Sequence, residues 1–533
     1  MNGVQRLTFV GPKPCWVVAL PMKTGKMVVG TLACACLVVA VLPALADPPA
    51  ASKPPSGLYL KAIKLEEAHE FARAEEIYRE LIRRSDSEQA WKQRRDAEQG
   101  LLRIEDMRAK FCWSEAQLRE QLAKTYRDFQ PSEFAEWERR GWLLFWKVDG
   151  KKLYYNTNVT NLQFFDTALM ARNESAAKGF QKFARLFLDE SARLDRIRAT
   201  GGAPQSSVDP VRFVFTAKAV VKQGDLPPGR VVRAWFPYPL LTPATQNIRT
   251  MSVQPAGALK SCPDVESSIG IAYLEMPRPE KDDLTIEMKV AFDACHTDFQ
   301  IEPDAIPPYD TQSELYRRFT RSEQQMELTK PLRELARTIV GHESNPYRKA
   351  RLLYDWVCDH VTYNFVWCWR DATFTHGCAS EEVRECHKGD CVIQSVFYAA
   401  LCRSVGIPAR VHNGPIFPPG MKNDHVWAEV WFPRYGWMPV DVTYSEVASM
   451  VPGLTDAERH TIRDFFFGRM DRWRLFTQRN ELAQELVPLK RSARRRTTMF
   501  VTPELECDGQ DVPKRAYTWS CEPASSADAG LRN

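Results

Sequence analysis

Three residues in the last third of the chain have the types and the order that thiol chemistry requires: Cys391, His425 and Asp441. A cysteine attacks as its thiolate, so it needs a neighbour that takes up its proton. An imidazole can do this, and it works best when a carboxylate orients it. These residues are therefore a candidate nucleophile, proton acceptor and orienting group, provided that the fold brings them together.

Cys391 is predicted to open a buried helix. Apolar residues recur at steps of three and four over residues 389–406. Asp390 is a suitable N-cap, and Gly406 suits the position just after the helix end. At the first helical position, unpaired backbone N–H groups and the positive end of the helix dipole favour an anion, so we expect a lowered pKa for the Cys391 thiol. Cys402 lies three turns deeper in the same helix, where a disulfide or a buried thiol is expected instead.

His425 and Asp441 are predicted to lie on one antiparallel hairpin. The segments "HVWAEVWF" (425–432) and "GWMPVDVT" (436–443) alternate between apolar and polar residues, with a turn between them. The two side chains share a face only if paired residue numbers sum to an even value, as when 431 lies opposite 437. A register shift of one residue would place His425 and Asp441 on opposite faces, so the register tests the assignment.

The sequence around these positions resembles the core of the transglutaminase-like superfamily, in an exported, bacterial form. The matching segments are "KGDCVIQSVFYAALCRSVGIPARV" and "DHVWAEVWFPRYGWMPVDVT", and the resemblance extends over about residues 345–445. It implies an α+β, papain-like fold, in which the helix that carries Cys391 packs on an antiparallel sheet that carries His425 and Asp441.

The resemblance also implies a reaction. Cys391 would be the nucleophile, His425 the general base and acid, and Asp441 the group that orients the imidazole. Attack on an amide carbonyl gives a thioester, which water hydrolyses or an amine converts into a new amide. The oxyanion would be held by the Cys391 backbone N–H and one side-chain donor. Family members often supply an upstream aromatic residue for this purpose, and the candidates for oxyanion or substrate contact are Tyr363, Trp367, Trp369 and Trp427.

Other interpretations of the polar residues are open. Cys391 could form a disulfide in a catalytically inactive binding module. A metal site is an alternative for a second set of residues, whose spacing fits no common zinc pattern: Cys368, His376, Cys378, Cys386 and His387. We therefore expect no metal and no cofactor. His412 and Asp424 lie close to the three catalytic candidates but outside the motif positions, and we interpret them as polar groups of loops or strands.

Residues 1–46 are predicted to be a leader. From Met22, the predicted true start, two lysines precede an apolar run over residues 27–42, and small residues precede a cleavage site before Asp47. The apolar run is short for a membrane span, and no later segment is long enough. We expect a periplasmic or secreted protein with no membrane span after cleavage.

The cysteine count fits a reactive thiol. Three of the 14 cysteines lie in the leader, which leaves 11 in the exported chain. An odd number in an oxidising compartment leaves at least one thiol outside the disulfides. Two pairs are expected, Cys262 with Cys295 and Cys507 with Cys521. The odd count agrees with a reactive Cys391.

Five segments are predicted after the leader. The first contains "EFARAEEIYRELIRRSD", which resembles the second helix of a tetratricopeptide repeat; it is either a partner-binding repeat or a plain helical hairpin. The segments are a helical region (58–110), a mostly helical region with a β-hairpin (111–200), a β-sandwich-like domain (208–300), the catalytic core (307–470) and a C-terminal extension (471–533).

Composition limits the function further. With 44% hydrophobic and 26% charged residues, the chain is typical of a globular protein. A net charge of +5 on 533 residues is too small to indicate nucleic-acid binding. We expect an exported thiol enzyme that acts on amide bonds of peptides or proteins, most simply by hydrolysis. The alternatives are protein-glutamine transamidation and an inactive scaffold that binds partners through its N-terminal helices.

Overall fold

The computed structural model of the protein describes residues 57–84, 91–200, 207–264, 267–365, 378–480, 484–493, 496–497, 499–512 and 514–524. The predicted leader lies outside these ranges, as do Trp367 and Trp369. Cys368 and His376 of the alternative metal set also lie outside them.

The N-terminal part of the described chain is mainly helical. Its helices are α1 (Gly57–Glu67), α2 (Phe71–Arg84), α3 (Trp91–Lys110), α4 (Glu115–Thr125), α5 (Pro131–Arg139), α6 (Asn158–Leu162), α7 (Thr167–Arg172) and α8 (Glu174–Ala199). A small sheet, in the order β1-β3-β2, is built from β1 (Phe111–Trp113), β2 (Phe145–Val148) and β3 (Lys151–Tyr155). The helical pattern of the first segment is broken between α1 and α2, where His69 takes a left-handed φ of 59°.

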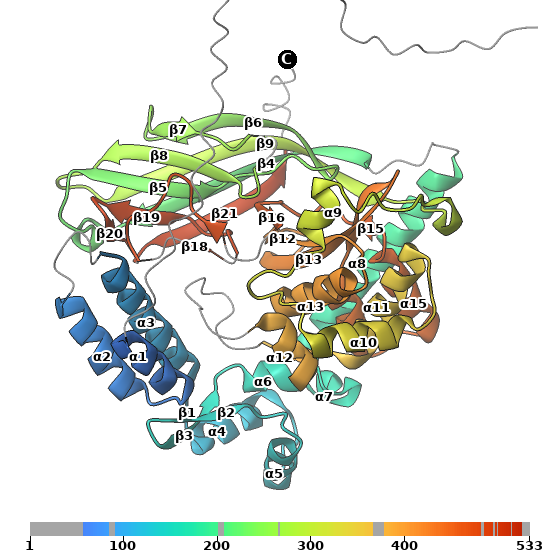
Figure 1. Ribbon diagram of the computed structural model, residues 1–533, viewed down its shortest axis with the longest axis horizontal. Helices are drawn as coiled ribbons and strands as arrows, with labels where there is room; N and C mark the ends of the chain where they lie inside the picture. Colours follow the sequence, from blue (N-terminus) through green and yellow to red (C-terminus); the bar gives the residue numbers. More distant parts are fainter. Residues whose placement is uncertain are drawn as a thin grey trace, which may run out of the picture. The chain divides into compact units, whose positions relative to one another are not determined.

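Two five-stranded sheets form a β-sandwich (Figure 1). One sheet has the order β15-β9-β4-β21 with β6 also paired to β9, and the other has the order β20-β19-β5-β8-β7. Their inward side chains share one buried cluster, which includes Phe215 and Val290 from the first sheet and Ala234 and Leu274 from the second. The strands are β4 (Val208–Val221), β5 (Val231–Pro237), β6 (Thr245–Gln254), β7 (Leu259–Ser261), β8 (Ile271–Pro277), β9 (Leu284–Asp298), β15 (Arg469–Met470), β19 (Glu504–Cys507), β20 (Gln510–Asp511) and β21 (Ala516–Pro523).

The C-terminal strands are an integral part of this sandwich, which the sequence did not predict. Strand β21 pairs with β4 along its whole length, from Ala516 opposite Val220 to Pro523 opposite Phe213. Strand β19 pairs with β5. The chain therefore leaves the sandwich after β9, forms the catalytic core and returns to complete both sheets.

No disulfide joins the cysteines of the described residues. The predicted pairs are therefore wrong for this structure. Cys507 and Cys521 lie in opposite sheets, and both are buried. Cys262 is exposed just after β7, whereas Cys295 is buried in β9. Buried thiols pack as small apolar side chains, so these positions are explained without a cross-link.

The remaining elements form the predicted α+β core. A four-stranded antiparallel sheet has the order β14-β13-β12-β16, and α13 is surrounded by α10, α11, α12 and α14 (Figure 1). The helices are α9 (Glu314–Phe319), α10 (Lys330–Val340), α11 (Pro346–His360), α12 (Ala379–Cys386), α13 (Cys391–Ser404), α14 (Val442–Met450) and α15 (Asp456–Phe465). The strands are β10 (Thr362–Tyr363), β11 (Lys388–Gly389), β12 (Ala409–Ile416), β13 (Asn423–Phe432), β14 (Gly436–Val440), β16 (Gln478–Asn480) and a separate pair, β17 (Gln484–Glu485) with β18 (Arg496–Thr497).

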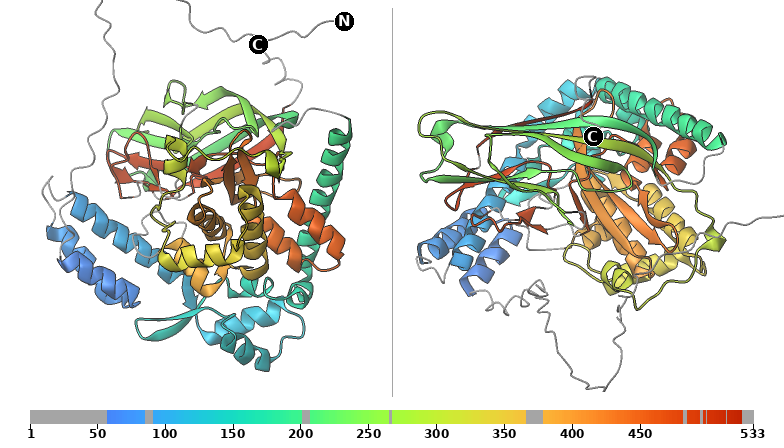
Figure 2. Two further views of the ribbon diagram at one scale, coloured as in Figure 1. Left: turned by 45° about the vertical axis from the view of Figure 1, so that its right-hand side comes forward. Right: turned by 90° about the horizontal axis from the view of Figure 1, so that it is seen from above.

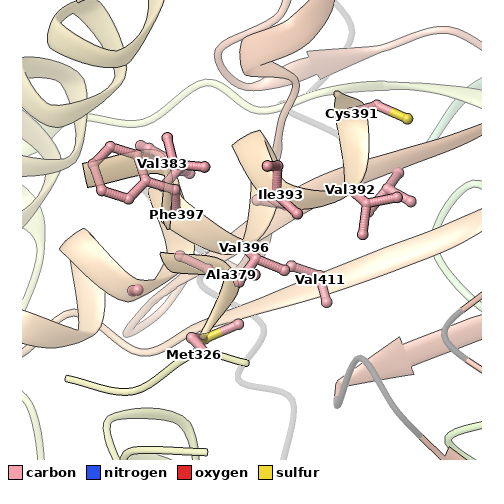
Figure 3. Close-up of a cluster of buried hydrophobic side chains, with 14 of the residues drawn as sticks. Met326, Ala379, Val383, Cys391, Val392, Ile393, Val396, Phe397 and Val411 are labelled. Atoms are coloured by element: carbon pink, nitrogen blue, oxygen red, sulfur yellow. The ribbon is translucent and has the colours of Figure 1, made fainter. Parts of the chain in front are cut away.

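Helix α13 is buried on all sides. Every residue from Cys391 to Ser404 is buried, and Val392, Ile393 and Phe397 belong to the largest apolar cluster of the core (Figure 3). Full burial of such a side chain contributes about 1.5–3 kcal/mol, so the cluster fixes the helix firmly. Within the described part of the chain, no helix has the length and apolar character needed to cross a bilayer.

Candidate active site

The start of α13 has the predicted cap. Asp390 has extended backbone angles, and its Oδ1 accepts hydrogen bonds from the backbone N–H groups of Val392 (3.0 Å) and Ile393 (3.3 Å). Gly406, just beyond the helix end, takes a left-handed φ of 79°, which glycine adopts without strain. The helix therefore begins at Cys391, as predicted, and an N-cap of this type stabilises it by about 1 kcal/mol.

The hairpin has the register that the sequence requires. Trp431 lies opposite Trp437, and Ala428 lies opposite Val440. Both pairs give an even sum, so His425 and Asp441 share one face of the sheet. Their side chains meet: His425 Nε2 lies 2.8 Å from Asp441 Oδ2. The register prediction is confirmed.

Asp441 is a fully buried carboxylate held by three donors. Besides His425, Arg474 Nη1 donates to its Oδ2 at 2.7 Å, and the Tyr444 backbone N–H donates to its Oδ1 at 3.1 Å. Burial opposes its ionisation, but the positive charges of His425 and Arg474 outweigh this effect and lower the pKa of Asp441 to about 2. Asp441 is therefore ionised at neutral pH and can stabilise a protonated imidazole.

The ring of His425 is held by aromatic side chains. Tyr444 stacks on it with ring centres 4.2 Å apart, and the ring of Trp427 lies nearly parallel to it at 6.2 Å. Since Nε2 donates its proton to the Asp441 carboxylate, Nδ1 of the neutral ring carries the lone pair. Nδ1 is thus the atom that can take up a proton.

Cys391 and His425 line one cavity of about 650 Å³. The Cys391 side chain is only 4% exposed, and Figure 3 shows its sulfur pointing away from the neighbouring apolar side chains of α13. A thiol and an imidazole that face the same space can exchange a proton and reach the same substrate carbonyl.

The other predicted site residues have different positions. Tyr363 lines the cavity, whereas Trp427 is fully buried and does not line it. Trp427 lies beside the His425 ring, with ring centres 6.2 Å apart, so in this structure it neighbours the candidate base and does not line the cavity. His412 is a buried strand residue bonded to Glu429, as its interpretation as a polar strand group requires. Asp424, on β13, lies at the cavity.

Two residues behind the site were not predicted from the sequence. Arg474 also donates to Asp471, at 2.8 Å, and its guanidinium lies 5.1 Å from the ring centre of Tyr444. Glu446 is buried on α14. Burial raises its pKa to about 8, although contacts with the Tyr363 backbone and Gln394 act in the opposite direction. Neither residue belongs to a motif, and a single arginine or glutamate among the many in the chain carries no signal.

Residues 333–442 match the family model described as the transglutaminase-like superfamily. This part of the chain is similar to the transglutaminase-like superfamily. The transglutaminase-like core thus includes Cys391, His425 and Asp441, whereas α1–α8 and the strands of the sandwich lie outside the match.

Solved structures give weaker similarities. A protein of Cytophaga hutchinsonii assigned as a cysteine protease aligns with 60% of this chain and 93% of its own, at 14% identity and a TM-score of 0.39. The periplasmic domain of TgpA from Pseudomonas aeruginosa, bound to ethylmercury, aligns with 45% of this chain and 91% of its own, at 16% identity and a TM-score of 0.22. Comparison with curated proteins found no match. The assignment therefore rests on the family match.

Proposed function

We propose that the protein is an exported thiol enzyme that hydrolyses amide bonds of peptides or proteins through a thioester on Cys391. One observation carries the proposal: the His425 imidazole is bonded to an ionised Asp441 at 2.8 Å and opens, together with the Cys391 thiol, onto a single cavity. The similarity of this core to the transglutaminase-like superfamily supports a cysteine enzyme in general.

In the first half of the proposed reaction, His425 Nδ1 takes the proton of the Cys391 thiol. The sulfur bonds to the carbonyl carbon of the substrate, and the oxygen receives the electron pair of the C=O bond. The Cys391 backbone N–H, at the positive end of α13, is placed to donate to this oxyanion. The intermediate then expels the amine, which takes the proton from His425 and leaves a thioester.

In the second half, water gives a proton to His425 Nδ1 and attacks the thioester carbonyl. The Cys391 sulfur leaves and recovers the proton, and the carboxylic acid is released. Asp441 stabilises the protonated imidazole in both halves, and Arg474 keeps Asp441 ionised. An amine in place of water would give transamidation.

The proposal is tested with a pair of cysteine variants in the same helix. Cys391→Ala removes the proposed nucleophile, whereas Cys402→Ala removes a buried thiol three turns away. Mass spectrometry of a proteome-derived peptide mixture identifies new termini and, with a fluorescent primary amine present, amine incorporation. We expect new carboxyl termini with the wild type and Cys402→Ala, and none with Cys391→Ala. Identical products from all three proteins would contradict the proposal, and amine incorporation in place of new termini would indicate transamidation.

Export rests on residues 1–46, whose sequence has the features of a secretory leader. Expression of the full chain followed by N-terminal sequencing of the mature protein tests this part of the proposal. A mature chain that begins at Asp47 in the extracytoplasmic fraction is expected, and an intact N-terminus in the cytoplasm would contradict it.

A further inference from the structure

One wall of the active-site cavity comes from α8, which lies outside the family match. Eight of its residues line the cavity. Five of them are small or apolar and recur at steps of three and four along the helix: Ala176, Gly179, Phe180, Phe183 and Leu186. Residues so spaced lie on one side of a helix. The other three are charged: Lys182, Arg185 and Asp189. The N-terminal helical region therefore contributes an apolar stripe, with charged residues beside it, to a site whose proposed catalytic residues lie in the core.

This wall is attached to the core at several points. Helix α8 packs along α15 (Figure 2, turquoise and orange helices). Arg185 forms an ion pair with Glu458, and Gln181 Nε2 donates to the backbone oxygen of Pro452 at 2.9 Å. At the far end of the helix, Arg469 reaches Asp195 at 2.6 Å. The wall is thus part of the folded site.

Aromatic contacts extend from this wall to the proposed catalytic residues. Phe164 lies edge-on to Phe180, with ring centres 5.6 Å apart, and to Tyr363 at 4.8 Å. Phe183 meets Tyr444 edge-on at 4.6 Å, and Tyr444 is the ring that stacks on His425. A group bound against this surface is therefore desolvated directly beside the thiol and the imidazole.

Gly179 leaves space in the wall. It lies within the 26-residue helix α8, where glycine weakens a helix relative to alanine. A Cβ atom added at Gly179 would meet no heavy atom within 4 Å, so packing does not require glycine there. Gly179 is exposed and lines the cavity, so a side chain added there would extend into open space at the cavity wall.

We propose that this surface is a subsite for a large apolar side chain, aromatic or long aliphatic, in the acyl part of the substrate. The inference rests on the proposed function. Cys391 is 4% exposed and lines this cavity, so an acyl group bonded to its sulfur must occupy it. Burial of a large apolar side chain against α8 would favour such substrates over those that carry only glycine.

The test measures how fast Cys391 reacts with reagents that resemble the acyl part. N-acetyl dipeptidyl chloromethyl ketones with the sequences Phe-Phe, Phe-Gly, Gly-Phe and Gly-Gly place either side chain in the last two positions, and the thiolate displaces chloride. Iodoacetamide, which has no side chain, corrects for the intrinsic reactivity of the thiol. With the wild type, we expect at least one Phe reagent to react about 30-fold faster than Gly-Gly, a ratio typical of a side chain that fills an apolar pocket.

Substitutions in α8 then locate the effect. Gly179→Leu fills the cavity and should reduce the ratio to about 3-fold or less, and Gly179→Ala should give an intermediate ratio. Phe180→Ala removes part of the wall without adding volume and should also reduce the ratio. Lys178→Leu adds the same leucine to the exposed residue next to Gly179 and should leave the ratio unchanged. Circular dichroism checks that each variant is folded.

The outcomes separate the two proposals. If iodoacetamide does not alkylate Cys391, the proposed function fails. If Cys391 is alkylated but the Phe and Gly reagents react equally, or if Gly179→Leu and Phe180→Ala both keep the full ratio, the apolar subsite is overturned and the thiol enzyme remains.

Discussion

Two histidine–carboxylate pairs lie on the same face of the core sheet, one on each side of Trp427. His425 is bonded to Asp441 and His412 to Glu429, at 2.8 and 2.7 Å between the same ring nitrogen and a carboxylate oxygen. All four residues are buried.

Each carboxylate also accepts a hydrogen bond from an arginine: Asp441 from Arg474, and Glu429 from Arg410. The pKa of each carboxylate is lowered to about 2. By hydrogen bonding alone, the two pairs are almost equivalent.

They differ at the second ring nitrogen. Nδ1 of His412 is buried and has no hydrogen-bond partner among the described residues, and burial lowers the pKa of His412 to about 4. His425 instead lines the cavity that Cys391 also lines. Hydrogen bonding to a carboxylate and an arginine therefore does not distinguish the proposed catalytic pair, whereas a shared cavity with a thiol does.

The largest expected effect separates the two histidines. His425→Asn removes the proposed proton acceptor and should lower kcat/KM by about 1,000-fold. His412→Asn should leave the activity of the folded protein unchanged but reduce the free energy of unfolding by about 2–3 kcal/mol, because Glu429 loses a buried partner. Kinetics and urea unfolding of both variants test this, and a loss of activity in His412→Asn with no loss in His425→Asn would reverse the comparison.

Substitution of the two carboxylates, Asp441 and Glu429, should give the next largest difference in activity. Asp441→Asn should lower kcat/KM by about 100-fold, because the protonated imidazole loses its counter-charge, whereas Glu429→Gln should affect stability only.

Acid unfolding provides a second measurement of the role of Asp441. The pKa of Asp441 is lowered from 3.8 to about 2, so its stabilisation is complete above pH 3.8 and is lost as the pH falls towards 2. Asp441→Asn should lack this loss, which amounts to about 2 kcal/mol in the wild type.

Substitution of the two arginines, Arg474 and Arg410, should give a smaller difference in activity. Arg474→Met leaves Asp441 without its guanidinium, so the pKa of Asp441 rises, and kcat/KM should fall by about 10-fold, as for other groups that orient a catalytic residue. The acid limb of the pH–rate profile should move to higher pH. Arg410→Met, beside Glu429, is the matched control. Equal pH profiles for the two variants would show that Arg474 acts only in packing.

Glu446 extends the comparison to a buried carboxyl on α14 whose pKa is raised rather than lowered. The unfolded chain releases this proton near pH 4.5, whereas the folded protein releases it near pH 8. The free energy of unfolding therefore falls as the pH rises from 4.5 to 8, by up to about 1.4 kcal/mol per pH unit. Glu446→Gln should remove this fall and be the more stable protein at pH 8. Urea unfolding between pH 5 and 8 measures it, with the exposed Glu105→Gln as a control that should follow the wild type.

The parts of the site that depend on local rules could be predicted from the sequence. The cap at Asp390 follows from residue types over a few positions, and the register that brings His425 to Asp441 follows from strand alternation and loop length. Both hold because backbone hydrogen bonding fixes these geometries within one helix or hairpin.

The parts that depend on distant contacts could not be predicted. Arg474 reaches Asp441 from a segment that has no motif, and α8 reaches the cavity from a region that looks like an ordinary amphipathic helix. The predicted disulfides failed for the same reason, since Cys507 and Cys521 are close in sequence but lie in opposite sheets. Strands that are close in sequence often lie side by side, but closeness alone does not place two of them in the same sheet.

Strand β21, which closes the first sheet of the sandwich, is synthesised after the entire catalytic core. Its partner β4 precedes the entire catalytic core, so the edge of β4 that pairs with β21 stays unpaired while the core emerges. Pairings between such distant segments form slowly, and an unpaired strand edge invites aggregation in the meantime. A chain that stays extended until β21 has emerged would avoid exposing this edge.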